Sequence, residues 1–215
     1  QEAFVRPFDL SYAPLIRAAL WQGTDGTYLL VDMHHIVSDG ISTPLLLRRL
    51  DASYRGETLP TPFASYKDYA YMLAQTPPEK KESMLAYWKN ALDGFEGVVD
   101  IPFDRPRPKE YDYSGKRLDF SLDENLSTRC DEYLTESGLS PYMFFAGIFV
   151  LLLAKMSGSA DITIGTPVSG RIYAELWDML GTFIGTMPLR LSAKNEMSLD
   201  EYFENVKNAV VNMLD

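Results

Sequence analysis

Two adjacent histidines are the residues in this sequence best suited to chemistry. His34 and His35 lie in the run MHHIVSDG, residues 33–40, and are the only histidines among 215 residues. An imidazole titrates near neutral pH, so it accepts a proton from an amine or hydroxyl nucleophile, or stabilises a charged intermediate. A bare histidine pair is more often a polar cap at a strand end. The longer pattern HHxxxDG, between a hairpin and a capped helix, favours a site.

The residues after the pair add to this interpretation. Asp39 is placed to orient an imidazole or to pair with a cation elsewhere in the chain. Gly40 permits a close backbone approach to a ligand. Ser38 lies beside the histidines, but the sequence has no G-x-S-x-G pattern, so Ser38 is a poor nucleophile candidate.

No metal site is expected. Successive side chains of a strand point to opposite faces, so His34 and His35 would not hold one ion together. The lone Cys130 forms no internal disulfide and belongs to no Cys/His metal pattern.

A hairpin and a helix are expected to position the histidines. Apolar runs at 14–22 and 28–35 flank the turn sequence Gly23-Thr24-Asp25-Gly26, which predicts an antiparallel hairpin. Thr43 is expected to cap the next helix, with Pro44 at its first position and Gly56 after its end.

The rest of the chain alternates helices and strands, which predicts an α/β (α+β) fold in two lobes. A segment rich in proline and glycine, 99–116, is typical of an extended connection between lobes. Further helices are expected at 65–74, 79–92, 126–137, 141–156 and 199–214, and further strands at 118–122, 161–167 and 180–191.

Composition excludes several classes of function. The formal net charge of −10 opposes binding to nucleic acid or to an anionic membrane surface. The longest apolar run, near 143–154, is too short to span a bilayer, and no signal peptide is expected. A cytoplasmic location fits these features. The missing initiator Met suggests an excised piece of a longer protein.

Several ordered motifs resemble the condensation domains of nonribosomal peptide synthetases. MHHIVSDG is similar to the signature of that superfamily, which shares its fold with chloramphenicol acetyltransferase. Further similarities lie at FVRPFDLS (4–11), YKDYA (66–70), YW (87–88), DRPRP (104–108), IGTPVSGR (164–171) and GTFIGTMPLR (181–190).

The resemblance implies a role for each matching residue. His35 would face a tunnel between two lobes, His34 would be mostly structural, and the backbone N–H of Gly40 would lie near the reacting carbonyl. Asp39 would pair with Arg171. Ser38 would line the tunnel with Gly185, which stands where the family usually has Asn.

The implied lobes are 1–100 and 118–215, joined by 101–117, in an incomplete two-lobed sandwich truncated at both ends. The implied activity, in secondary metabolism such as antibiotic biosynthesis, is amide bond formation between donor and acceptor peptidyl carrier domains, each with a phosphopantetheine arm. Adenylation domains would neighbour the chain, and no cofactor would bind it directly. Three alternatives stay open: an epimerization domain, an acyltransferase using coenzyme A, and a degenerate domain that only binds a carrier.

Overall fold

The structure is a computed structural model that describes residues 4–97, 99–106 and 108–214. Contacts group the chain into two compact units, each built from two stretches of sequence. The first unit contains Gln1–Ser83 and Pro167–Thr186, and the second contains Met84–Thr166 and Met187–Asp215. This grouping follows contacts rather than chain order, so the lobes assigned from the sequence stay a prediction.

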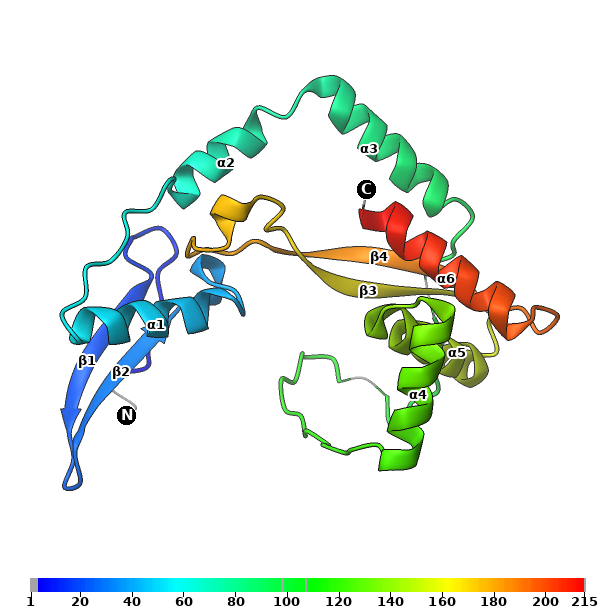
Figure 1. The fold of residues 1–215 in the computed structure, drawn as a ribbon, viewed down its shortest axis with the longest axis horizontal. Helices are drawn as coiled ribbons and strands as arrows, with labels where there is room; N and C mark the ends of the chain where they lie inside the picture. Colours follow the sequence, from blue (N-terminus) through cyan, green and yellow to red (C-terminus); the bar gives the residue numbers. More distant parts are fainter. Residues whose placement is uncertain (1–3, 98, 107, 215) are drawn as a thin grey trace. The chain divides into compact units, whose positions relative to one another are not determined.

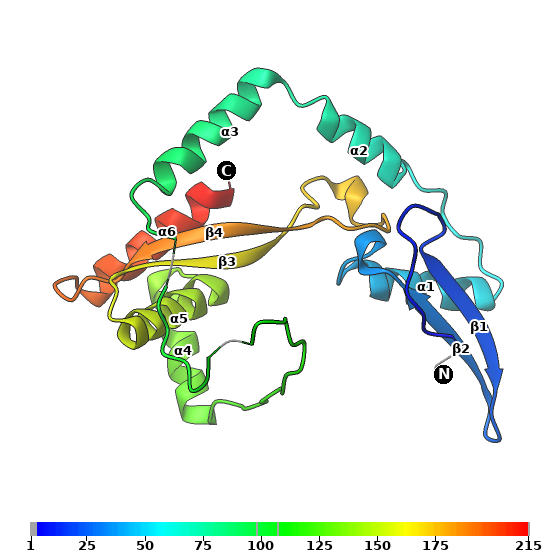
Figure 2. The same cartoon turned by 180° about the vertical axis from the view of Figure 1, so that it is seen from behind.

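The first unit begins with the predicted hairpin (Figures 1 and 2). Strands β1 (Ile16–Gln22) and β2 (Thr27–Met33) pair antiparallel, with Gln22 opposite Thr27. The N–H of Gly23 donates to the carbonyl of Gly26 at 2.8 Å and closes the turn. The prediction that the strand continues to His35 was wrong, because β2 ends at Met33.

Helix α1 (Ser42–Tyr54) follows the histidine motif. The prediction that Thr43 caps this helix was wrong. The carboxylate of Asp39 instead accepts hydrogen bonds from the N–H of Ile41 at 3.2 Å and of Ser42 at 2.8 Å. Asp39 therefore supplies the partners that the first N–H groups of a helix need. The predicted stop at Gly56, whose φ is 78°, is confirmed.

Helix α2 (Tyr66–Ala74) begins at a capping box. The Ser65 hydroxyl accepts from the N–H of Asp68, and the Asp68 carboxylate accepts from the N–H of Ser65. Helix α3 (Pro78–Ala91) follows and crosses from the first unit into the second.

The second unit contains α4 (Glu124–Ser137), α5 (Pro141–Ser157) and α6 (Leu199–Leu214). Its core includes five residues that are at most 2% exposed: Val150, Ile162, Leu189, Val206 and Val210. Glycine permits α5 and α6 to approach closely, because a Cβ on Gly147 would lie 2.8 Å from the Phe203 ring. The Tyr202 hydroxyl donates to the carbonyl of Gly147 at 2.8 Å.

Strands β3 (Asp161–Ser169) and β4 (Ile184–Ser192) form the second two-stranded sheet. The Gly170 N–H donates to the Phe183 carbonyl at one end, and the Ala193 N–H donates to the Ala160 carbonyl at the other. This pairing makes the two strands antiparallel.

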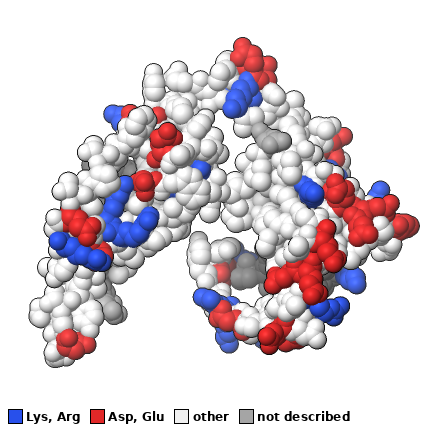
Figure 3. All heavy atoms as spheres, viewed as in Figure 1, with Lys and Arg blue, Asp and Glu red and all other residues white. Residues whose placement is uncertain are grey.

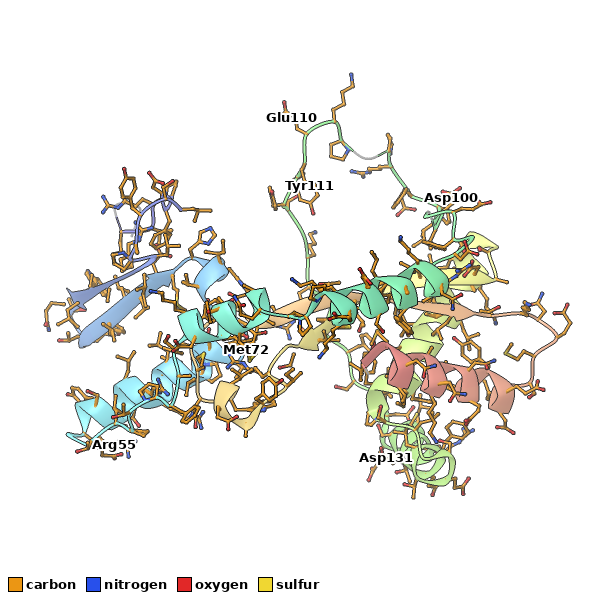
Figure 4. All side chains as sticks on the ribbon, turned by 90° about the horizontal axis from the view of Figure 1, so that it is seen from above. Arg55, Met72, Asp100, Glu110, Tyr111 and Asp131 are labelled. Carbon is orange, nitrogen blue, oxygen red and sulfur yellow. The ribbon has the colours of Figure 1, made fainter. Side chains whose placement is uncertain are left out.

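The predicted strand at 118–122 was wrong. Its residues have no regular secondary structure, and Leu118 and Phe120 are more than 80% exposed. Alternating polarity specifies a strand only where a neighbouring strand accepts its hydrogen bonds. The described residues before it, 99–106 and 108–117, also lack helix and strand, and Asp100, Glu110 and Tyr111 mark their course in Figure 4.

Acidic side chains gather around α4 and α6 on the face shown in Figure 3. Glu124, Asp200 and Glu201 lie in the first turns of these helices, where the positive end of the helix dipole stabilises negative charge.

Among the helices that the structure describes, none alone is long and apolar enough to cross a membrane. Helices α4 and α5 pass that test of length and composition only as a pair, bent by 109°.

Candidate active site

The histidine motif forms a tight turn at the end of the hairpin. The chain leaves β2 at Met33 and forms a short 3-10 helix at His35–Val37. The N–H of His34 donates to the carbonyl of Leu15 at 3.0 Å, which ties the turn to the start of β1. The expectation that the two rings lie on opposite faces of a strand was therefore wrong, because neither residue lies in one.

The two histidines have different surroundings. His34 Nδ1 accepts a hydrogen bond from the N–H of Ile36 at 3.1 Å, and the His34 ring meets the edge of Phe8 at 6.1 Å between centroids. His35 is exposed, and no hydrogen bond to its ring occurs within the described ranges. His34 therefore stabilises the turn, whereas the His35 imidazole is available to another molecule.

Asp39 forms the ion pair with Arg171 that the resemblance implied. Arg171 Nη2 lies 3.0 Å from Asp39 Oδ1 and 3.2 Å from Oδ2. The side chain of Arg171 is fully buried, and that of Asp39 is 5% exposed. Removing one partner of such a pair would leave the other charge buried without compensation, which destabilises the fold.

Arg171 is held from its other sides as well. Its Nη1 donates to the carbonyls of Leu176 and Met179, the latter at 2.7 Å. Its guanidinium carbon lies 4.0 Å from the centre of the Phe183 ring, a cation–π arrangement. These contacts fix the cation that faces Asp39.

Ser42 completes the network. Its fully buried hydroxyl oxygen lies 2.8 Å from Asp39 Oδ1 and 2.8 Å from the carbonyl oxygen of Gly181. The same oxygen accepts from the Gly181 N–H at 3.1 Å and from Arg171 Nη2 at 3.2 Å. One hydroxyl therefore joins the start of α1 to the segment before β4.

The carboxylate of Asp39 is stabilised in its charged form. Burial alone would raise its pKa, but hydrogen bonds from the hydroxyl and N–H of Ser42, the N–H of Phe183 and Arg171 outweigh burial. Together they lower the pKa of Asp39 to about 2. Asp39 thus holds the loop as an anion rather than exchanging protons near neutral pH.

Glycines let the supporting segments pack closely. A Cβ on Gly181 would lie 2.2 Å from the Tyr66 ring, and a Cβ on Gly170 would lie 2.3 Å from the Phe183 carbonyl oxygen. Tyr66 also packs its ring against that of Phe183, with centroids 5.2 Å apart. Larger residues at these two glycines would displace the segment that holds Asp39.

The structure shows no specific role for three other predicted site residues: Gly40, Gly185 and Ser38. A Cβ on Gly40 would meet no described protein atom within 4 Å, and one on Gly185 would meet only Val168, at 3.8 Å. Ser38 is 6% exposed. Close approach of a ligand to Gly40 and lining roles for Ser38 and Gly185 stay predictions. No group of three or more potential metal ligands occurs in the described part of the chain.

Three residues of this site were not predicted from the sequence: Ser42, Tyr66 and Thr182. Ser42 carried a local signal, because a helix start with Asp three residues earlier is typical of a capped end. Tyr66 belongs to the motif YKDYA, and no signal in the sequence indicates that its hydroxyl donates to the Thr182 carbonyl.

Comparison with known proteins identifies the fold and the family. The chain is 38% identical to surfactin synthase subunit 2 of Bacillus subtilis (strain 168) across 99% of its length, but spans only 6% of that protein. Among solved structures, it resembles a complex of the X-domain and OxyB from teicoplanin biosynthesis (TM-score 0.86, 23% identity). That match covers 97% of this chain and 49% of the other.

It also resembles holo-AB3403, a four-domain nonribosomal peptide synthetase bound to AMP and glycine. The TM-score is 0.79 and the identity 28%, over 97% of this chain and 16% of that one. These similarities confirm the predicted α+β fold of the chloramphenicol acetyltransferase-like class. The family model described as "Condensation domain" matches residues 1–215. Matched along its whole length, the chain belongs to the condensation domain family of nonribosomal peptide synthetases.

Proposed function

We propose that this chain, within its full-length parent, forms an amide bond between two carrier-bound substrates. The amine nitrogen of an aminoacyl acceptor attacks the thioester carbonyl carbon of an aminoacyl or peptidyl donor. A C–N bond forms and the C–S bond breaks. The amine loses a proton, and the donor arm leaves as a thiol. The peptide then remains on the acceptor carrier.

His35 has the central role in this proposal. Its imidazole orients the attacking amine or accepts its proton. The observation that supports this role is the contrast within one turn, where His35 is exposed while Asp39 is anchored by the buried Arg171. A rigid turn fixes the position of the imidazole, and correct positioning supplies much of the rate of such a transfer.

Both substrates arrive on phosphopantetheine arms of donor and acceptor carrier domains. Adenylation domains in the same multidomain chain would load those carriers. Membership in a family of large synthetases supports these partners and a cytoplasmic location. No metal ion or directly bound cofactor has a part in the proposed step.

Dipeptide formation with and without His35 tests the proposal. The full-length parent is supplied with one aminoacyl donor carrier and one aminoacyl acceptor carrier. Carrier-bound dipeptide is then followed by intact-protein mass spectrometry. We expect His35→Ala to lower the rate at least 100-fold, the usual minimum contribution of a general acid or base, with carrier binding unchanged. An equal rate in wild type and His35→Ala would contradict the role of His35.

Gly185 motivates one alternative function, a degenerate domain that binds a carrier without catalysis. In the motif GTFIGTMPLR, glycine replaces the Asn expected from the resemblance, and only Val168 lies within 4 Å of a Cβ placed there. Carrier binding without dipeptide in the wild type, and dipeptide formation by Gly185→Asn, would favour this alternative. Loss of the substrate α-hydrogen would instead indicate an epimerization domain.

A further inference from the structure

Thr182 contacts the histidine turn from a distant part of the sequence. Its hydroxyl oxygen lies 3.1 Å from the carbonyl oxygen of His35 and 3.1 Å from that of Ser38. The hydroxyl has one proton, which is shared between the two carbonyls. One side chain therefore spans the turn from His35 to Ser38.

The turn has few backbone hydrogen bonds of its own. Its backbone hydrogen bonds run from Val37 N–H to the His34 carbonyl at 3.1 Å and from Ser38 N–H to the His35 carbonyl at 3.3 Å. Both have the short 3-10 spacing, which gives poorer geometry than an α-helix. An external donor to the turn therefore has a large share in fixing its shape.

Thr182 is itself fixed from the opposite side. The hydroxyl of Tyr66, at the start of α2, donates to the Thr182 carbonyl at 2.7 Å. The residues on either side of Thr182 are held too, since Gly181 bonds Ser42 and the Phe183 N–H donates to Asp39 Oδ2 at 3.1 Å. The Thr182 hydroxyl thus projects from an anchored backbone.

We propose that Thr182 is a positioning residue that sets the orientation of His35 through the backbone of the turn. The inference rests on the proposed function, because it assigns Thr182 to the same reaction. Thr182 touches no reacting atom in this scheme. Its hydroxyl keeps the His35 backbone in the one arrangement from which the imidazole meets the amine.

The test compares two substitutions at Thr182 in the full-length parent. Thr182→Val keeps the shape of the side chain and removes the hydroxyl, whereas Thr182→Ser keeps the hydroxyl. We expect Thr182→Val to lower kcat for dipeptide formation about fivefold, the effect of losing one neutral hydrogen bond. KM for both carrier substrates should stay within about twofold, and Thr182→Ser should keep kcat within about twofold of wild type.

Thr163→Val is the matched control. Thr163 lies in the second unit, and its buried hydroxyl has no hydrogen-bond partner among the described residues. This variant should keep the wild-type kcat. Three outcomes would overturn the inference: wild-type kcat in Thr182→Val, an equal loss in Thr182→Ser, or a change confined to KM.

Hydrogen exchange separates this inference from the proposed function. In Thr182→Val the amides of Val37 and Ser38 should exchange at least threefold faster than in wild type or Thr182→Ser, by mass spectrometry of the peptide that contains them. If wild type forms no dipeptide, the proposed function fails, and exchange still shows whether Thr182 holds the turn. Unchanged exchange in Thr182→Val would contradict the inference even where His35 proves essential.

Discussion

His35 and Asp39 stand four residues apart in one motif, yet their side chains differ in burial and in hydrogen bonding. Asp39 is buried and receives hydrogen bonds from Ser42, Phe183 and Arg171. His35 is exposed, and the structure shows no hydrogen bond to its ring in the described ranges. A substitution at Asp39 therefore acts on the fold, and one at His35 acts on the proposed chemistry with little effect on the fold.

Gly40 allows the two kinds of effect to be separated at a single residue. Its φ is not positive, and a Cβ there would meet no described atom within 4 Å. We therefore expect Gly40→Ala to change the free energy of unfolding by less than about 0.5 kcal/mol, as for most surface substitutions. If a substrate carbonyl approaches the Gly40 N–H, the added methyl group should lower dipeptide formation at least tenfold.

Urea denaturation and dipeptide formation measure the two effects in the full-length parent. Gly26→Ala is the matched control, because a Cβ on Gly26 also meets no described atom within 4 Å and Gly26 lies in the hairpin turn. It should leave both quantities unchanged. Wild-type activity in Gly40→Ala would show that no substrate group approaches the Gly40 N–H closely.

At the scale of elements, the segment Gly181–Phe183 links the starts of α1 and α2. Gly181 meets the Tyr66 ring so closely that a Cβ would lie 2.2 Å from it. We expect Gly181→Ala to destabilise the parent by about 3 kcal/mol, through overpacking and through the φ of 156° at this position, which residues other than glycine rarely adopt. Activity should fall as well, because Gly181 also bonds Ser42.

A double substitution identifies the cause of this loss. Tyr66→Ala removes the ring that the new methyl group would strike, so Gly181→Ala should cost less stability in that background than in wild type. Gly115→Ala, whose Cβ would meet no described atom within 4 Å, should be neutral. Strictly additive free energies of unfolding would show that the Tyr66 ring is not the obstacle.

Local signals predicted most elements well. The bounds of α6 agree with the prediction at both ends, because its apolar residues recur at helical spacing. The end of β2 was misplaced because MHHIV is apolar enough to continue a strand, whereas the turn depends on hydrogen bonds to Leu15 and Thr182. A strand at 118–122 failed for a related reason, since no described strand pairs with it.

Long-range contacts limited what could be predicted of the site. The pairing of Asp39 with Arg171 came only from the family resemblance, because 132 residues separate the two. The contacts of Ser42 with Gly181 and of Tyr66 with Thr182 span 139 and 116 residues. Neither periodicity nor spacing registers such pairs, because both describe neighbours along one element.

At the scale of the whole molecule, acid should weaken the fold through Asp39. Its pKa is about 2 in the folded chain, against an ordinary value of 3.8. The folded state therefore binds fewer protons than the unfolded state between these values, and stability rises with pH across that window. The contribution of Asp39 is present above about pH 4 and is lost as the pH falls toward 2.

Asp39→Asn should remove this contribution. Near pH 6 we expect the free energy of unfolding of the variant to be about 2 kcal/mol lower than that of wild type. This is the size of the pKa shift of Asp39 converted to energy. The difference should shrink below about pH 4 and be only a few tenths of a kcal/mol at pH 2, where about half of the folded wild type has Asp39 protonated. Urea denaturation of the full-length parent at several pH values measures this difference.

Asp112→Asn is the control, because it removes an exposed carboxylate bonded to Ser114. Its free energy of unfolding should differ less from that of wild type. A constant difference between wild type and Asp39→Asn from pH 6 to pH 2 would mean that the charge of Asp39 does not stabilise the fold.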